Sequence, residues 1–211
     1  MTRSCRYKDT GQAFPIYITV VGGLLFLAFA YLAVGQAAAN RNGAQTAADA
    51  AALAAAQDAR DQLGGLWAQD VLDPTRWQDI FDGIVTGLEP SCPRAEELAA
   101  QNDADVLSCA ADGPLRFTVE VETNRGVGES IVPGTENKRS RASATAVIEP
   151  RCTFEPPADE ADETDETDEA DEAEDKVLPE LTCDDRDWQL DPEDLEILPE
   201  PDDLFDVHLA D

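Results

Sequence analysis

Five cysteines and a single histidine carry the most specific chemistry of this 211-residue chain. The histidine, His208, lies three residues from the C-terminus, so there is no histidine pair for zinc and no well-placed base for a serine or cysteine nucleophile. The cysteines form no C-x-x-C pair, which argues against a zinc ribbon and a redox centre. Gly126-Val127-Gly128 is too short for a phosphate-binding loop. We therefore predict no catalytic residue, no metal site and no cofactor, and we expect that the protein is not an enzyme.

Carboxylates are abundant and concentrated towards the C-terminus. Residues 153–211 hold 26 of the 45 Asp and Glu residues, and the whole chain has a net charge of −30. Residues 158–175 run through the triplets ADE-ADE-TDE-TDE-ADE-AED, which bury too little apolar surface to offset the entropy of ordering. We interpret this segment as a solvated spacer; loose binding of divalent cations is the alternative, although no EF-hand spacing is present. So negative a chain repels phosphates, which argues against nucleic acid as a partner.

Four cysteines are predicted to form disulfides. They are Cys92, Cys109, Cys152 and Cys183. Four cysteines allow three pairings, and the sequence proves none of them. We favour Cys92–Cys109 and Cys152–Cys183 because each ring closes within one segment, and the chain-entropy model assigns loops of this size roughly 3–4 kcal/mol each. Such bridges need an oxidising compartment.

The element on which the rest of the chain depends is an apolar run without a charge, from Phe14 to Val34. At ~1.5 Å per residue, a helix of this length spans the ~30 Å hydrocarbon core of a bilayer. Three basic residues precede the run, whereas only Arg41 follows it closely, so the positive-inside rule places the N-terminus in the cytoplasm. We predict residues 1–13 as a cytoplasmic segment and residues 14–35 as a single-pass transmembrane helix. A cleaved secretory signal is the alternative.

Alanine and leucine extend this helix outward through residues 36–63, with Gly35 and Gly43 as the expected bends. Small side chains recur along one face, at Ala44, Ala48, Ala51, Ala55 and Ala59. These alanines either only support helicity or form a face on which another helix packs closely, in this chain or in another. If the face is an association surface, leucine at two of its positions should harm assembly more than folding.

Helical and alternating patterns follow one another beyond the alanine-rich segment. The apolar spacing from Trp77 to Leu88 predicts a helix that begins at Asp73-Pro74, and a shorter helix follows over residues 94–101. Alternating apolar side chains then predict two strands that pair with each other, over residues 117–121 and 140–149.

Together these elements predict an α+β protein. A single N-terminal transmembrane helix continues into an alanine-rich external helix, followed by a small domain of helices and antiparallel strands over residues 64–152. Residues 153–211 are expected to be an acidic low-complexity tail, mostly disordered, whose scattered apolar side chains either dock on a partner or fold back on the core.

Two stretches at the start of the long helix carry a resemblance to a known family. Gly11-Gln12-Ala13 opens the apolar run, and residues 43–56 read GAQTAADAAALAAA. This region resembles the TadE/TadG-like proteins of Flp/Tad pilus assembly, whose signature is Q-x-A-A-D-A-A-A-L-A-A-A. The informative positions here are Gln45, Asp49 and Leu53.

The resemblance implies a single-pass protein of the bacterial cell membrane with a cytoplasmic N-terminus. It further implies a non-enzymatic accessory or structural part of a pilus or related secretion apparatus, in contact with other envelope subunits through residues 36–63. Prepilin-like members are cut after a glycine and carry Glu at the fifth mature position. A cut after Gly11 would place Ile16 there, which favours an unprocessed, membrane-retained protein. The alternative function is a surface-anchored binding protein whose acidic tail captures cations or basic envelope partners.

Overall fold

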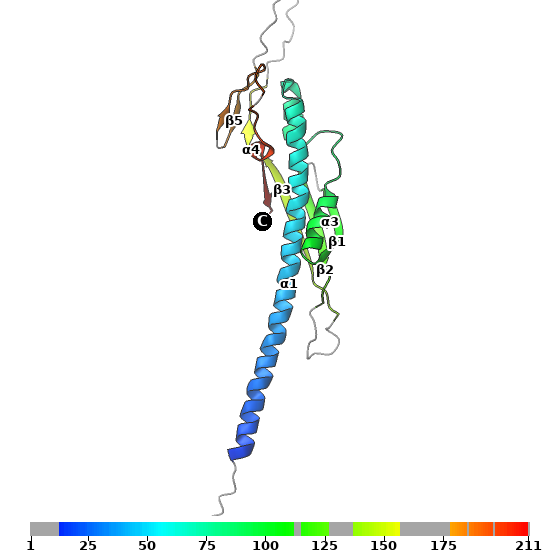
Figure 1. Ribbon diagram of the computed structural model, residues 1–211, viewed down its shortest axis with the longest axis vertical. Helices are drawn as coiled ribbons and strands as arrows, with labels where there is room; N and C mark the ends of the chain where they lie inside the picture. The colour runs from blue at the N-terminus through cyan, green and yellow to red at the C-terminus, as the bar shows by residue number, and fades with distance from the viewer. Residues whose placement is uncertain are drawn as a thin grey trace, which may run out of the picture.

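The computed structural model describes residues 13–111, 115–126, 137–156, 178–184, 186–195 and 197–210. One helix runs along the molecule, and the other elements pack along its C-terminal half (Figure 1). The helical elements are α1 (Ala13–Gln69), η1 (Pro74–Arg76), α2 (Trp77–Phe81), α3 (Cys92–Gln101) and α4 (Pro201–Leu204). The strands are β1 (Ala104–Ala111), β2 (Arg116–Thr123), β3 (Arg141–Pro150), β4 (Cys152–Thr153), β5 (Leu181–Cys183), β6 (Asp187–Trp188) and β7 (Phe205–Leu209).

α1 is one helix of 57 residues, as the continuous alanine and leucine pattern predicts. Its helical conformation is uninterrupted at Gly35 and Gly43. It ends at Gln69 instead of Leu63, because it continues across Gly64-Gly65. A glycine is required at the first of these positions: a Cβ on Gly64 would lie 2.7 Å from the Cβ and Cγ atoms of Pro201 in α4. Gly64 therefore marks a close approach of α1 and α4, and the glycine pair does not end the helix.

The main sheet has four antiparallel strands in the order β1-β2-β3-β7. The two predicted strands are β2 and β3, and their alternation is confirmed. Every second side chain is buried: Phe117, Val119 and Val121 in β2, and Ala144, Ala146 and Ile148 in β3. This face packs on α1, and α3 covers the β1 edge of the same side. The sheet thus has one apolar and one polar face, as expected for an antiparallel sheet covered on one side.

The core lies between α1 and the sheet, and its composition changes along the helix. Near the middle of α1 the core is built from alanines, which bring helix and sheet close together. Towards the C-terminal end of α1 the core is aromatic. Trp67 and Trp77 have ring centroids 5.4 Å apart, and Phe154 lies 5.2 Å from Trp77. The interpretation of both tryptophans as core residues is confirmed, because neither is exposed.

α2 is shorter than the predicted helix, which extended to Leu88. Gly83 adopts a positive φ of 68° directly after the last turn. Its N–H donates to the carbonyl of Ile80 (3.0 Å), and the Ile84 N–H donates to the carbonyl of Asp79 (2.7 Å). This pair of bonds is the Schellman arrangement that ends helices at glycine. Ile84, placed on the apolar helix face by its spacing, is instead 66% exposed.

The C-terminal part of the chain differs most from the expectation of a mostly disordered tail over 153–211. β4, β5 and β6 form a second, three-stranded sheet, and β7 is an edge strand of the main sheet beside β3. Leu204 and Phe205 are buried in the core. The described residues 178–210 therefore fold back on the core, which is one of the two possibilities that the sequence leaves open. The acidic triplets at 158–175 lie outside the described residues.

Candidate functional site: an anchor helix continuous with the domain core

The N-terminal part of α1 has an apolar surface on all sides. Within the described chain, α1 is the one helix long and apolar enough to cross a membrane. No residue of its most apolar stretch is buried inside the protein. Between Phe14 and Val34 the large apolar side chains are 52–83% exposed. An exposed apolar surface of this extent is unfavourable in water but suited to lipid. This arrangement supports the predicted membrane anchor.

Asn40 is the first side chain of α1 that the domain holds, and the sequence analysis did not identify it. Its Nδ2 donates hydrogen bonds to the carbonyl oxygens of Arg125 (3.0 Å) and Gly126 (3.4 Å), and Thr123 Oγ1 donates to its Oδ1 (3.4 Å). Only residues 35–39 separate this contact from the apolar run, so at ~1.5 Å per residue Asn40 lies roughly 9 Å beyond Val34 along the helix. The domain is therefore mounted directly on the anchor.

The predicted small-residue face is buried inside this chain. Ala44, Ala48, Ala51 and Ala55 are 0% exposed, and Ala59 is 5% exposed. α1 packs here against β2, β3 and α3, so the close approach that small side chains allow is made to the protein's own sheet and helix. The packing partner of this face therefore belongs to the same chain. While the domain is folded, the alanine face is not accessible to another subunit.

The three signature positions lie beside this face. Gln45 Nε2 donates to Asp49 Oδ1 (2.7 Å) one turn further along α1, and Leu53 is half-buried against the core. The first two side chains line a cavity of about 320 Å³ together with Arg116, Thr145 and the end of β7. The cavity forms where β7 ends, because β7 pairs with β3 only as far as Ala146. Gln45 and Asp49 therefore lie on the side of α1 where β7 no longer covers the helix.

Both favoured disulfides are present. Cys92–Cys109 joins α3 to β1, and Cys152–Cys183 joins β4 to β5. Each disulfide is a crosslink between two neighbouring elements. Their close pairing in sequence was the signal that identified them.

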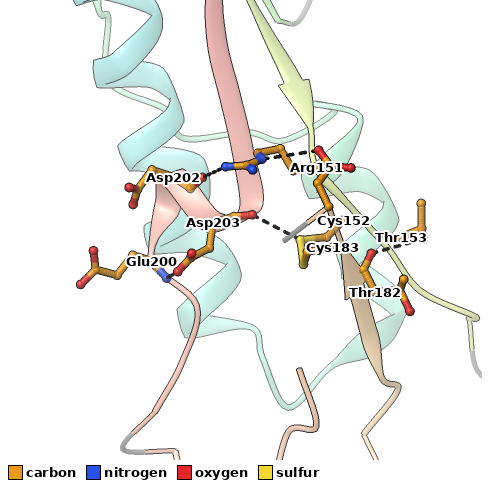
Figure 2. The surroundings of a disulfide bond; sticks show 9 residues. Arg151, Cys152, Thr153, Thr182, Cys183, Glu200, Asp202 and Asp203 are labelled. Atoms are coloured by element: carbon orange, nitrogen blue, oxygen red, sulfur yellow. Dashed lines mark hydrogen bonds and ion pairs between the residues drawn. A yellow bond between two sulfur atoms is a disulfide. The ribbon is translucent and has the colours of Figure 1, made fainter. Parts of the chain in front are cut away.

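Arg151, which the sequence analysis missed, connects the second disulfide to the C-terminal segment (Figure 2). Its guanidinium donates to the carbonyl oxygen of Asp202 (3.1 Å) and lies 3.5 Å from the Asp184 carboxylate. Its backbone N–H donates to the carbonyl of Leu204 (2.8 Å), and its own carbonyl accepts from the Asp184 N–H (3.1 Å). One residue therefore links the end of β3, the disulfide-bonded sheet and α4.

His208 is part of β7 and not of a flexible tail. Its Nδ1 lies 2.9 Å from an Asp206 carboxylate oxygen, and its Nε2 lies 3.9 Å from Glu149, all on the polar face of the sheet. Within the described residues, no group of three or more His, Cys, Asp or Glu side chains is arranged to hold a metal ion. On the same polar face, a hydrogen bond from Arg141 (2.9 Å) lowers the pKa of Glu122 below its ordinary value, with Arg139 adding to this effect.

The comparison with protein families supports the resemblance. Residues 11–58 match the Tad family model, described as "Putative Flp pilus-assembly TadE/G-like". Residues 11–58 of this chain are therefore similar to TadE/TadG-like proteins. The match covers the apolar run, Asn40 and the three signature positions, and it ends inside the core-forming part of α1. No curated protein and no solved structure matches the chain.

Proposed function

We propose that this protein is a membrane-anchored, non-enzymatic structural component of an Flp/Tad-type pilus-assembly or related secretion apparatus. The observation that carries the proposal is the continuity of α1. The TadE/TadG-like region and the core of the outer domain belong to one uninterrupted helix, which Asn40 joins to the sheet where α1 enters the domain. A helix of this kind holds the domain at a fixed height and tilt relative to its anchor. That is useful to an assembly component and unnecessary for a freely tethered binding protein.

We infer that the N-terminus is cytoplasmic and the rest of the chain extracytoplasmic. The basic residues before the apolar run support this orientation. The two disulfides support it as well, because such bonds persist in oxidising compartments.

The surface through which α1 meets other envelope subunits must be one that its own domain leaves open. The alanine face is occupied, whereas the side chains of the anchor, residues 14–35, are accessible nearly all round the helix. We therefore place the contacts with other subunits of the apparatus along the anchor part of α1, and not at Ala38 or along the buried alanines.

Ala38→Pro tests the proposal, with Ala38→Leu as the matched control. Ala38 is exposed and lies between the anchor and the Asn40 contact. Proline inside a helix costs about 3 kcal/mol and kinks or breaks it, whereas leucine preserves helicity. In the producing bacterium, with the variants replacing the native gene, we expect the proline variant to lose surface pili or secretion while the protein remains at the membrane with both disulfides. The leucine variant should be active.

Two results would contradict the proposal. Normal pili and secretion in a strain that lacks the gene would exclude the pilus function. Full activity of the proline variant would exclude fixed coupling between anchor and domain.

One observation favours the alternative function, capture of basic partners by the acidic segment. β4 and β5 pair directly, Thr153 with Thr182, so the described residues on either side of the acidic segment lie next to each other, near the C-terminal end of α1 (Figure 1). Deletion of residues 158–175 distinguishes the two functions. Under the assembly function this deletion retains activity; under the binding function it abolishes partner capture, while Ala38→Pro does not.

A further inference from the structure

The end of the domain nearest the apolar run is rich in basic side chains. α1, β2 and β3 come together at this end. The Asn40 side chain bonds to the Arg125 carbonyl, and Glu122 of β2 pairs with Arg141 of β3. Figure 1 shows β2 reaching the end of the sheet that points towards the N-terminal half of α1. The described basic residues at this end, which we call the basic surface, are Arg41 next to Asn40 on α1, Arg125 after β2, Lys138 and Arg139 just before β3, and Arg141 at its start.

Nearby carboxylates only partly neutralise the basic surface. Arg125 pairs with Asp103 (3.3 Å), and one carboxylate, Glu122, pairs with both Arg139 (3.6 Å) and Arg141 (2.9 Å). Asp105 lies opposite Glu122 in the sheet and is the third carboxylate among the described residues at this end. Among the described residues, five basic groups therefore face three acidic ones, in a chain whose net charge is −30.

These basic side chains are accessible. The side chain of Arg125 is 80% exposed, and those of Arg139 and Arg141 are about half exposed or more. Arg41 and Lys138 are also exposed, and the described part of the chain places no carboxylate within ion-pair distance of either. The surface can therefore still bind an anion with several of its groups.

We propose that the basic surface binds the headgroups of anionic phospholipids in the leaflet from which α1 emerges. Asn40 lies about 9 Å beyond the apolar run, and the headgroup region extends some 5–8 Å beyond the hydrocarbon core on each side. The surface is therefore within a Debye length, about 8–10 Å, of the lipid phosphates. Guanidinium groups pair well with phosphate. This inference rests on the membrane anchorage in the proposed function, and it holds for either orientation of the chain.

The experiment uses the full-length protein in lipid nanodiscs and measures how fast its lysines react with an amine-acylating reagent. The chain has three lysines, Lys8, Lys138 and Lys176, so mass spectrometry of peptides resolves each of them. In discs of phosphatidylcholine that contain phosphatidylglycerol, we expect Lys138 to react several-fold more slowly, relative to Lys176, than in discs of phosphatidylcholine alone. High salt should remove this protection, because it screens the attraction.

Two triple variants separate the basic surface from general charge effects. Arg41→Gln, Arg125→Gln and Arg139→Gln together should abolish the protection of Lys138. Arg60→Gln, Arg76→Gln and Arg94→Gln change the net charge equally and also remove ion pairs, with Asp61, Asp70 and Glu97, but leave the basic surface intact. This control should retain the protection.

The outcomes that overturn the proposal are distinct. Equal reactivity of Lys138 in both lipid compositions, or equal protection in both, excludes recognition of anionic headgroups. Protection in native membranes but not in phosphatidylglycerol discs would assign the surface to a protein. Extraction of the full-length chain from discs at alkaline pH would instead show that α1 is not inserted, which contradicts the anchorage itself.

Discussion

At Gly64, the absence of a side chain allows α1 and α4 to pack closely. A Cβ there would lie 2.7 Å from two side-chain atoms of Pro201 and 3.0 Å from its Cα, so α4 would have to move. Gly64→Ala therefore gains about 1 kcal/mol of helix propensity but adds an overpacking cost of typically 1–3 kcal/mol. We expect a net loss of about 1 kcal/mol of unfolding free energy, measured by urea denaturation of the full-length protein in detergent with tryptophan fluorescence.

Gly65 supplies the control, because a Cβ there meets nothing within 4 Å. Gly65→Ala should raise the unfolding free energy by about 0.5–1 kcal/mol through helix propensity alone. Equal stability of the two alanine variants would show that α4 does not press on the helix at this point.

At the scale of single elements, the alanine face of α1 sets the distance between helix and sheet. Ala48 and Ala55 have no exposed surface. Leucine at either position forces three extra carbon atoms into a packed interface, and we expect each substitution to cost about 1–3 kcal/mol of unfolding free energy. The measurement is thermal or urea unfolding in detergent. Ala38→Leu, on the exposed part of the same helix, should be neutral within about 0.5 kcal/mol.

This outcome differs from the expectation that such variants would lose partners and keep a folded domain. Should both leucine variants unfold like the wild-type protein while envelope partners are lost, the alanine face would be an intermolecular surface after all, and the packing of α1 on the sheet described above would be wrong.

Periodic patterns determined how much of the fold could be predicted. β2 and β3 carry an alternation that is visible within ten or so residues, the long helix carries a continuous apolar and alanine-rich composition, and Pro93 marks the start of α3; all four elements are confirmed. β1 was missed because a register shift between Val106 and Ser108 interrupts its alternation. The Schellman turn at Gly83 was missed because the apolar spacing that predicted the helix continues past this glycine to Leu88.

The missed strand β7 shows a different limit. Phe205, Val207 and Leu209 do alternate with Asp206 and His208, but five residues within an acidic segment predict an edge strand only weakly. Its pairing with β3 spans more than fifty residues of sequence, and nothing local encodes it. The same reason applies to the candidate site: the anchor and the disulfides are local features and could be predicted, whereas the contacts of Asn40 and Arg151 join distant segments and could not.

For the molecule as a whole, the main sheet is complete only when the C-terminus returns to it. β3 would otherwise be an open edge at its C-terminal half, and the side chains of Leu204 and Phe205, 0% and 1% exposed, would be missing from the core. Truncating a large buried apolar side chain costs about 2–5 kcal/mol, so loss of both exceeds much of a domain's stability of 5–15 kcal/mol. We expect deletion of residues 201–211 to prevent stable folding of the full-length protein in detergent.

Deletion of residues 158–175 is the matched comparison, because it removes more residues but no described core side chain. The unfolding free energy of this variant should then lie within about 1 kcal/mol of the wild-type value, and Cys152–Cys183 should still form. Leu204→Ala gives an intermediate case that remains folded, with a loss of about 2–5 kcal/mol. Urea unfolding of the three variants, followed by tryptophan fluorescence, to which the buried Trp67 and Trp77 contribute, tests this order. If the 201–211 deletion were as stable as the 158–175 deletion, the C-terminal strand would be an accessory to the domain. If Leu204→Ala alone were neutral, the site would be less well packed than its burial indicates.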